Sequence, residues 1–547
     1  MMFHRPRVAP AALVAGSGLW MATAGNAPLW RELDALGLLT QPSGWLLAGA
    51  LGLMIASLLV ALLSLLAWRW TLKPAILVLL LATAVGAHFM LSYHIVIDST
   101  MVVNVLQTDQ RESAALLGWG FLGSLLWGAL IPGWVVWRVR TDTRPWPRQA
   151  LRNLGMTAGA LALFAGVVLA SFQPLASTMR NHKHLRYLLN PLNTLYAVGD
   201  VAAQPLRRPP GPVQPLGTDA RLAASTSTKP ALLVLVLGET ARAANFGLNG
   251  YERPTTPELA REDVVSFRGA FSCGTSTAAS VPCMFSNLGR AGFDGRQRDS
   301  ENLLDVLQHA GLAVLWIDNQ AGCKGVCERV PNVSTSSAKD PQLCGTDGEC
   351  LDAILLKDID ARVNALPAER RARGVVLVMH QMGSHGPAYS RRSPREYKRF
   401  TPECASINLQ ECSREQVVNA YDNSIAYTDH VLASAIGWLK QRQDQYDTAM
   451  VYLSDHGESL GENNLYLHGM PYSLAPDVQK RVPWITWLSP GFARRTGVAT
   501  ECLRGRADAP VSHDNYFHSV LGLMQVQTSV YQRGLDAYAP CAQRGAP

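Results

Sequence analysis

The strongest constraint on the fold of this chain is the uneven distribution of apolar residues along it. Of the 547 residues, those up to about 171 form mostly apolar runs, whereas the sequence after about 225 is typical of a soluble α/β protein. Because about 20 apolar residues span a bilayer as a helix, the first part predicts a membrane domain. The second part is long enough for one large globular domain.

Five segments have the length and composition of membrane-spanning helices, namely 11–30, 44–67, 75–95, 115–137 and 151–171. Basic residues around Arg5, Arg69 and Arg144 flank these segments, and such residues favour the cytoplasmic side of a membrane. An odd number of spans then puts everything after about 172 outside. Because membrane orientation explains much of the Lys and Arg, and no nucleic-acid motif is present, we expect no nucleic-acid partner.

All ten cysteines lie in the second part of the chain. An even number confined to one region indicates disulfides formed in an oxidising compartment, which agrees with an outer location. We assume that near neighbours pair, as Cys273–Cys283, Cys323–Cys327, Cys344–Cys350 and Cys404–Cys412, with Cys502 and Cys541 remaining. A metal site at Cys323 and Cys327 is the alternative, and it is disfavoured because no second cysteine pair has zinc-finger character.

The chain is expected to contain a transmembrane domain over 1–172, a bridging helix and linker over 173–229, and a catalytic domain over 230–547. Within the bridge, 181–198 mixes Leu and Tyr with His, Lys and Arg, which predicts an amphipathic helix at the membrane interface. The loop 96–114 places Asn104 and Glu112 near the predicted membrane surface. These side chains are either simply solvated or contact a zwitterionic headgroup.

Short apolar runs in the second part have the length and β-branched content of buried parallel strands. They are 232–237, 313–317, 375–379, 449–453 and 484–488, with helical patterns between them at 301–310, 415–440 and 512–524. This alternation predicts a doubly wound α/β sheet, in which ligands bind beyond the carboxyl ends of the strands.

Four of the predicted strands end in polar groups that suit a metal-centred active site. A single His or Asp at a strand end is often only a cap, but this sheet edge collects carboxylates and imidazoles from several strands. The candidates are Glu239, His385, Asp455, His456 and His468. Oxygen and imidazole ligands suit zinc or, less well, manganese.

The segment 271–286 offers a nucleophile for such a site. It holds Thr275, Ser276 and Thr277 in a short loop that the inferred Cys273–Cys283 disulfide would close. A hydroxyl becomes a good nucleophile only when a base or a metal lowers its pKa. The same residues also suit the N-cap of a helix starting near Ala278, and the two roles are compatible because a helix N-terminus favours phosphate.

At this point the chain resembles the lipid A phosphoethanolamine transferases, the family that includes the mobile colistin-resistance enzymes. The resemblance covers nearly the whole chain and rests on long motifs: NVLQTDQRE (104–112), GETARAANFGLNGY (238–251), CGTSTAASVPCMFS (273–286), NQAGCKGVC (319–327), HQMGSHGP (380–387), SDHGESLGE (454–462) and YLHGMPYSLAP (466–476). It implies a five-helix transmembrane domain followed by an alkaline-phosphatase-like α/β/α sandwich of the sulfatase type.

The resemblance also implies roles for the residues that match these motifs. Thr277 corresponds to the nucleophile that becomes phosphoethanolaminated, and Glu239, Asp455 and His456 correspond to a zinc set that Thr277 completes. His385 and His468 resemble second-site residues that bind phosphate or a further zinc, and they are also candidates for catalytic proton transfer. The other implied substrate-binding residues are Asn104, Glu112, Gln320, Lys324 and His380.

The function implied is zinc-dependent transfer of phosphoethanolamine from phosphatidylethanolamine to a phosphate of lipid A, through an ester of Thr277. The enzyme is expected to be a monomer in the bacterial inner membrane, in contact with membrane lipids, with its catalytic domain in the periplasm. Adding an ethanolamine cation lowers the negative charge of the surface, which implies polymyxin and colistin resistance.

Four alternatives to this function are considered. The acceptor is alternatively a lipopolysaccharide core sugar or another periplasmic glycan. A phosphoglycerol transferase or lipoteichoic-acid-type synthase has the same architecture, and the cysteine-bounded CGTST loop argues against it. A non-catalytic membrane sensor is disfavoured because structural zinc sites are normally closed by four protein ligands without a reactive hydroxyl. A sulfatase is disfavoured because its signature has Pro two residues after Cys, whereas Pro282 precedes Cys283.

Overall fold

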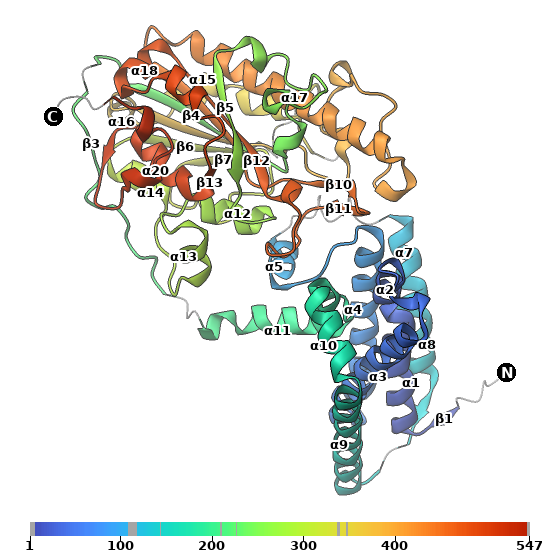
Figure 1. Ribbon diagram of the computed structural model, residues 1–547. Helices are drawn as coiled ribbons and strands as arrows, with labels where there is room; N and C mark the ends of the chain where they lie inside the picture. The colour runs from blue at the N-terminus through green and yellow to red at the C-terminus, as the bar shows by residue number, and fades with distance from the viewer. Residues whose placement is uncertain are drawn as a thin grey trace. The chain divides into compact units, whose positions relative to one another are not determined.

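The computed structural model describes residues 6–107, 118–142, 144–207, 211–225, 227–335, 338, 340–345 and 348–543. The chain divides into two compact units (Figure 1). One comprises Met1–Val102 with Leu116–Ala202, and the other Val103–Ala115 with Ala203–Pro547. We call them the helical unit and the α/β unit.

In the described part of the chain, four helices of the helical unit are long and apolar enough to cross a membrane. They are α3 (Pro42–Leu65), α4 (Leu72–Ser92), the composite helix Trp119–Arg138 and α9 (Trp146–Ala170). The composite helix consists of α7 (Trp119–Leu125), a π-helical turn (Leu126–Leu130) and α8 (Ile131–Arg138). Pro132 follows the π turn closely, and a proline removes one hydrogen bond from the helical ladder.

The predicted membrane span over 11–30 is wrong as a single helix. The chain there forms α1 (Pro10–Thr23) and α2 (Ala27–Ala35), separated by a 3-10 turn. With 14 residues, α1 is roughly 21 Å long, which is less than the roughly 30 Å of a bilayer core. The buried Asn26 side chain donates to the Met21 carbonyl at 2.8 Å, so it competes with the backbone where the helix breaks.

The remainder of the helical unit and the start of the α/β unit are also helical. α5 (Ser99–Gln107) occupies the first part of the predicted outer loop, and Asn104 lies on it, whereas Glu112 lies outside the described residues. The bridge forms α10 (Phe172–Asn181), a 3-10 helix (Lys183–Leu188) and α11 (Leu192–Arg207). The predicted amphipathic helix over 181–198 is therefore divided before Pro191, whose ring cannot continue a helical ladder.

An eight-stranded sheet forms the centre of the α/β unit, in the order β13-β5-β12-β9-β4-β8-β6-β7. The strands are β4 (Ala231–Gly238), β5 (Val264–Phe271), β6 (Ala313–Asp318), β7 (Asn332–Ser334), β8 (Val375–His380), β9 (Asp447–Ser454), β12 (Arg481–Leu488) and β13 (Val511–Ser512). All five predicted strands are present. The predicted direction of the last one is wrong, because β12 pairs antiparallel with both β9 and β5.

Helices cover both faces of this sheet (Figure 1). One face packs in a common apolar core with α12 (Thr277–Met284), α14 (Leu303–His309) and α20 (His513–Leu523), while α17 (Arg414–Lys440) packs against β9 outside that core. The shorter helices are α13 (Gly289–Gly295), α15 (Ile359–Asn364), α16 (Ala368–Arg371), α18 (Pro490–Thr496) and α19 (Thr500–Gly505). Burial of both faces explains why β4, β6, β8 and β9 are continuous apolar runs.

Smaller strand pairs complete the fold. They are β1 (Arg7–Val8) with β2 (Arg140–Thr141), β3 (Arg221–Leu222) with β14 (Val526–Gln527), and β10 (Ser459–Glu462) with β11 (Leu465–Leu467).

Five disulfides join the ten cysteines of the α/β unit. The structure confirms the assumed neighbouring pairs, Cys273–Cys283, Cys323–Cys327, Cys344–Cys350 and Cys404–Cys412, and joins Cys502 to Cys541. No free cysteine remains in the described chain.

Candidate active site

Two carboxylates and one imidazole meet at the carboxyl ends of two neighbouring parallel strands. Glu239 follows β4, and Asp455 and His456 follow β9, with Gly238 and Ser454 opposite each other in the ladder. His456 Nε2 lies 3.4 Å from Glu239 Oε1 and 3.4 Å from Asp455 Oδ2, and all three side chains are fully buried. One ligand atom from each of the three lies within 4.8 Å of the other two, so a single metal ion fits among them.

Hydrogen bonds orient this cluster and leave particular atoms open. The Nδ1–H of His456 donates to the Gly457 carbonyl at 2.9 Å, which directs Nε2 at the carboxylates. Asp455 Oδ1 accepts from the backbone N–H groups of Thr240 and His456. Asp455 Oδ2 is buried with no hydrogen-bond partner among the described residues. Such an orphaned oxygen is costly unless a cation or proton occupies the site.

The charges in the cluster perturb one another strongly. Burial and the neighbouring charge of Glu239 raise the pKa of Asp455 to about 7. Burial would lower the pKa of His456, but the charges of Asp455 and Glu239 raise it to about 10. Burial would raise the pKa of Glu239, but the hydrogen bond and charge of His456 hold it well below its ordinary value. Two anions and one cation leave one negative charge without a counter-charge in a dry site.

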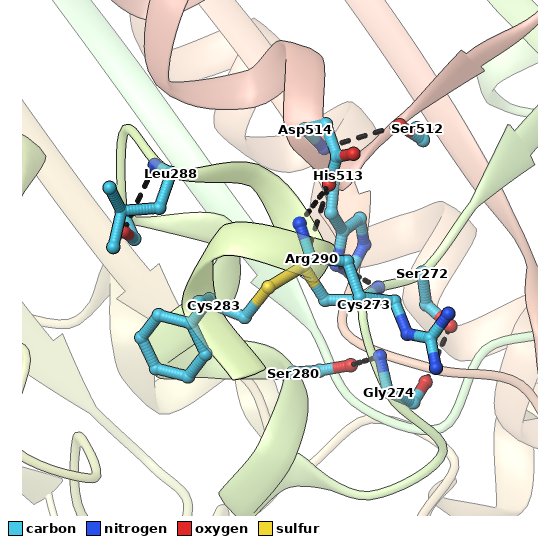
Figure 2. Close-up of a disulfide and its surroundings, with 12 residues drawn as sticks. Ser272, Cys273, Gly274, Ser280, Cys283, Leu288, Arg290, Ser512, His513 and Asp514 are labelled. Atoms are coloured by element: carbon cyan, nitrogen blue, oxygen red, sulfur yellow. Dashed lines mark hydrogen bonds between the residues drawn. A yellow bond between two sulfur atoms is a disulfide. The ribbon is translucent and has the colours of Figure 1, made fainter. Parts of the chain in front are cut away.

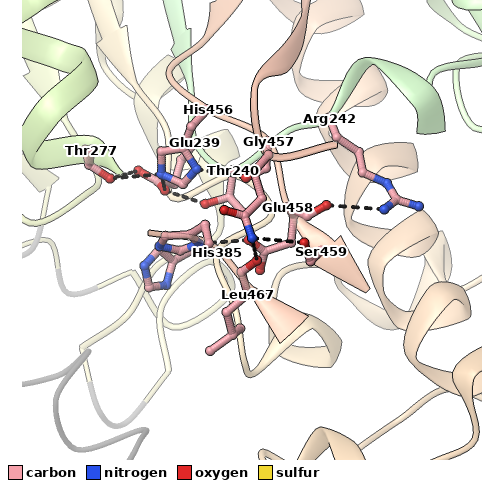
Figure 3. A network of polar contacts seen from close by, with 12 residues as sticks. Glu239, Thr240, Arg242, Thr277, His385, His456, Gly457, Glu458, Ser459 and Leu467 are labelled. Atoms are coloured by element: carbon pink, nitrogen blue, oxygen red, sulfur yellow. Dashed lines mark hydrogen bonds and ion pairs between the residues drawn. The ribbon is translucent and has the colours of Figure 1, made fainter. Parts of the chain in front are cut away.

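Thr277 presents its hydroxyl to this cluster from the first residue of α12 (Figure 3). Its Oγ1–H donates to Glu239 Oε2 at 3.0 Å, and Oγ1 lies 3.5 Å from His456 Nε2. Ser276 is the N-cap residue of α12, but its side chain makes no capping hydrogen bond. Its hydroxyl is buried and has no partner in the described chain. The helix begins at Thr277, one residue before the predicted start near Ala278. Of the two neighbouring hydroxyls, that of Thr277 contacts the Glu239 carboxylate.

The loop before α12 is held from several sides (Figure 2). The Cys273–Cys283 disulfide closes it, and Thr275 donates through its hydroxyl to the Met470 carbonyl at 2.6 Å. His513, at the start of α20, accepts from the Cys273 N–H at 3.1 Å and donates to the Ser454 carbonyl at 2.9 Å. Burial lowers the pKa of His513 to about 3, so it is neutral and bridges the loop before α12 to the end of β9, which Asp455 follows.

Strained backbone next to Glu239 sets the direction of its carboxylate. Thr240 has φ of 58°, an unusual conformation for a β-branched residue, and its hydroxyl donates to Glu239 Oε1. Gly383, with φ of 53°, lies directly against this turn. A Cβ at Gly383 would come within 2.5 Å of the Glu239 carbonyl oxygen, so only glycine permits this approach.

A second buried pair lies at the same sheet edge. Asp318 at the end of β6 and His380 at the end of β8 are directly opposite in the ladder, with His380 Nδ1 3.0 Å from Asp318 Oδ2. The Trp316 indole N–H also donates to Asp318 Oδ2 at 2.8 Å. His380 Nε2 is buried and has no hydrogen-bond partner in the described residues. Burial would lower the pKa of His380, but the charge and hydrogen bond of Asp318 raise it, and Glu239 and Asp455 add to this effect.

The two remaining histidines, His385 and His468, lie beside the cluster of Glu239, Asp455 and His456. The ring centroid of His468 is 4.3 Å from that of His456 and 5.7 Å from that of His385. His468 Nδ1 lies 2.8 Å from Glu458 Oε2, and the Tyr389 hydroxyl donates to the other oxygen of Glu458. Burial and the charge of His456 lower the pKa of His468 to about 3, and burial raises the pKa of Glu458 to about 8.

The other predicted substrate-binding residues are less closely grouped. Lys324 lines a cavity of about 380 Å³ together with Ala278 and Pro282 of α12. The carbonyl oxygen of the Gln320 side chain accepts from the Ala321 N–H within its own loop, and Asn104 lies on α5. Glu112 is outside the described residues.

Sequence reasoning assigned no role to four residues that position this site, namely Asp318, Gly383, Glu458 and His513. Asp318 had a detectable signal, because it ends a strand as Glu239 and His380 do. Glu458 follows His456 by two residues. The role of His513 depends on its contacts with Cys273 and Ser454. These residues lie 240 and 59 positions away in the sequence, so no local pattern reveals the contacts.

Comparison with known proteins agrees with this geometry. Residues 55–206 match the family described as phosphoethanolamine transferase EptA/EptB, and residues 231–526 match the sulfatase family. The chain is 39% identical over 495 residues to the phosphoethanolamine transferase EptA of Escherichia coli (strain K12), over 88% of this chain and 87% of the relative. It is 37% identical over 535 residues to the phosphatidylethanolamine transferase Mcr-1 of Escherichia coli, over 96% of both chains.

A solved structure shows the same architecture over both units. The integral membrane protein lipooligosaccharide phosphoethanolamine transferase A (EptA) from Neisseria meningitidis superposes with a TM-score of 0.93 at 34% identity, over 98% of this chain and 100% of that one. The expected fold is confirmed: apolar membrane helices precede a sulfatase-type, alkaline-phosphatase-like α/β domain. From these similarities and the site geometry, the chain belongs to the phosphoethanolamine transferase family of integral membrane enzymes.

Proposed function

We propose that this enzyme transfers phosphoethanolamine from phosphatidylethanolamine to a phosphate of lipid A, through an ester formed on Thr277. The observation that carries the proposal is the buried contact between the Thr277 hydroxyl and the Glu239 carboxylate, 3.0 Å apart, beside His456. A buried hydroxyl that contacts a carboxylate in this way suits covalent catalysis better than it suits a purely structural role.

The residues fit a zinc ion. Three features favour a bound cation: Asp455 Oδ2 has no partner in the described chain, one negative charge of the cluster is uncompensated, and Nε2 of His456 faces the carboxylates. Carboxylate and imidazole donors suit zinc. Glu239, Asp455 and His456 would hold it, with the Thr277 hydroxyl as the fourth group. When bound, zinc supplies Lewis-acid chemistry that lowers the pKa of this hydroxyl and offsets negative charge on phosphate oxygens.

In the first step, Thr277 Oγ attacks the phosphorus of phosphatidylethanolamine, forming a phosphoethanolamine ester as the bond to the glycerol oxygen breaks. The proton of Thr277 is held at Glu239 Oε2 in the resting site. The glycerol oxygen takes up a proton and diacylglycerol leaves, and His385 is the proposed proton donor, because the lowered pKa of His468 leaves that ring neutral. In the second step, a phosphate oxygen of lipid A attacks the same phosphorus, the bond to Thr277 breaks, and Thr277 Oγ takes its proton back from Glu239 Oε2.

Positively charged groups complete the proposed substrate pocket. Phosphoryl transfer depends mainly on positioning and on stabilising charge. Lys324 and His380 would interact with the nonbridging oxygens, with Gln320 nearby and with Asn104 and Glu112 contacting the lipid headgroup. The raised pKa of His380 supports a cationic role for that residue.

The proposed location is the bacterial inner membrane, with the α/β unit in the periplasm. Five disulfides support an oxidising compartment, and the basic residues at one set of helix ends support a cytoplasmic side for those ends. Addition of an ethanolamine cation to lipid A would reduce the binding of cationic peptides such as polymyxins.

The test is expression in a polymyxin-sensitive Gram-negative host, followed by mass spectrometry of purified lipid A. We expect the mass of lipid A to increase by one phosphoethanolamine group. In Thr277→Ala, the transfer rate should fall by a factor of roughly 10³ or more. Ser276→Ala is the matched control, since it removes the neighbouring hydroxyl that does not contact Glu239, and it should retain transfer. Normal transfer by Thr277→Ala would refute the nucleophile assignment. Unchanged lipid A with modified core sugar would move the acceptor to the glycan.

A further inference from the structure

A small cavity lies among helix ends of the helical unit, apart from the proposed active site. It has a volume of about 220 Å³ and lies where α3 has ended, α4 begins and α9 begins. Trp68, Trp70 and Trp146 line it together with Arg69 and Arg144, and one carboxylate, that of Asp142, is also in the lining. All three helices are among those apolar enough to cross a membrane, so the cavity is expected near a membrane surface.

Specific contacts shape this cavity. Gln149 is buried in its wall and donates to the Ala67 carbonyl at 3.1 Å and to Asn153 Oδ1 at 2.7 Å, which joins α9 to the turn after α3. The rings of Trp68 and Trp146 stack with centroids 6.1 Å apart. The cavity is therefore preformed.

Positive charge and exposed aromatic rings surround it. The chain segments at this end of the helices, 6–10, 66–73 and 138–152, carry eight basic residues and a single carboxylate, Asp142. Trp70 and Trp146 are 76% and 72% exposed, and the Arg69 guanidinium lies 4.6 Å from the centroid of the Trp70 ring. Exposed Trp beside Arg is typical of the headgroup level of a membrane.

We propose that this cavity binds the phosphate headgroup of an anionic phospholipid. Arg side chains recognise phosphate oxygens well, and the excess of positive charge favours a lipid with net negative charge over zwitterionic phosphatidylethanolamine. The volume lies below the roughly 300–1,000 Å³ of pockets that enclose a whole ligand, so the acyl chains would stay in the bilayer beside the helices. This lipid is distinct from the proposed donor and would brace the turn after α3 against the start of α9.

The test is native mass spectrometry of the full-length protein, delipidated in a neutral detergent and titrated with phosphatidylglycerol or phosphatidylethanolamine of the same acyl chains. We expect phosphatidylglycerol to bind more tightly. The double variant Arg69→Gln/Arg144→Gln should weaken that binding roughly 25-fold, because each basic residue near an anionic surface contributes roughly fivefold.

The matched control is Arg31→Gln/Arg180→Gln, which removes two arginines of the same unit, on α2 and α10, that do not line the cavity. It should leave phosphatidylglycerol binding unchanged. Equal binding of both lipids by the wild type, or equal losses in the two double variants, would overturn the proposal. Displacement of the lipid by glycerol phosphate at matching concentration would also overturn it, because the cavity would then select a free phosphate ester. Trp146→Ala gives an independent check, since loss of the ring should weaken lipid binding with both arginines present.

Discussion

Two buried clusters share one edge of the sheet, and they differ in how their charges balance. Glu239, Asp455 and His456 combine two carboxylates with one imidazole and leave Asp455 Oδ2 without a partner in the described chain. Asp318 and His380 combine one carboxylate with one imidazole, and the Trp316 indole adds a hydrogen bond, so the charges balance although His380 Nε2 also lacks a partner in the described chain. The first cluster is incomplete without a cation, whereas the second is electrically complete. The difference separates residues suited to hold a metal from residues suited to orient one another.

The largest effect is expected from Glu239→Gln, which removes one negative charge from the first cluster. We expect loss of bound zinc and loss of transfer by a factor of roughly 10³ or more, because the variant replaces a proposed carboxylate ligand with a neutral amide and gives the Thr277 hydroxyl a weaker, uncharged acceptor. Elemental analysis and lipid A mass spectrometry provide the measurements. Unchanged zinc content would exclude Glu239 as a ligand. Asp318→Asn, in the balanced cluster, is the control and should keep its zinc.

A smaller loss is expected from Gly383→Ala, which alters the backbone against Glu239. A Cβ there meets the Glu239 carbonyl oxygen at 2.5 Å, so Glu239 must shift, and displacement of a catalytic group by about 1 Å costs roughly 10²-fold in rate. Gly250→Ala is the control, because Gly250 also has a positive φ but has no atom within 4 Å of the added Cβ. Equal effects of the two variants would attribute the loss to backbone strain alone.

Asp318→Asn should lower the transfer rate by roughly 10–100-fold, the range found when a partner that orients a functional histidine is removed. The reason is that His380 loses the carboxylate that fixes its ring and favours its charged form. The rate should be compared across pH, because a purely structural role would lower it equally at all pH values. Activity equal to that of the wild type would show that the pair is not needed for positioning.

The smallest effect concerns stability as a function of pH. Burial would raise the pKa of Asp318 above 3.8, but the charge and hydrogen bond of His380, together with the hydrogen bonds from Trp316 and Gly322, lower it. The pKa of His380 is raised from 6.5. The pair therefore contributes its full stabilisation of the fold between pH 3.8 and pH 6.5, the ordinary pKa values of the two groups. Its stabilisation is lost as pH falls through the lowered pKa of Asp318 and as pH rises through the raised pKa of His380. A pKa that differs by one between the folded and unfolded chains contributes about 1.4 kcal/mol to the free energy of unfolding.

The Tm of the full-length enzyme in detergent, measured from pH 5 to 9, tests this expectation. Above pH 6.5 the Tm of the wild type should fall more steeply than that of Asp318→Asn. Parallel profiles for the two proteins would mean that the pair does not titrate in this range.

The contrast between the clusters also shows how far sequence reasoning reaches. It identified Glu239, Asp455 and His456 as one group because the carboxyl ends of parallel strands meet at one edge. The resemblance implies a substrate-binding role for His380, but no sequence pattern pairs His380 with Asp318. Their pairing depends on β6 lying beside β8, and strand order is decided by contacts between distant segments.

Local sequence was sufficient to predict the division into membrane and α/β regions, the five buried strands, the neighbouring disulfides and the family. These features depend on composition, on short spacings or on long motifs. Tertiary contacts were needed to reveal the break between α1 and α2, the antiparallel direction of β12 and the presence of β5. β5 alternates between more and less buried positions, so it lacked the continuous apolar run that marked the other strands.

Folding also brings His513 between the loop before α12 and β9, and Gly383 against Glu239, and no local pattern predicts either contact. The physical reason is that local periodicity reports whether a segment is buried. Strand direction, neighbouring segments and single close contacts depend on packing between residues far apart in the chain.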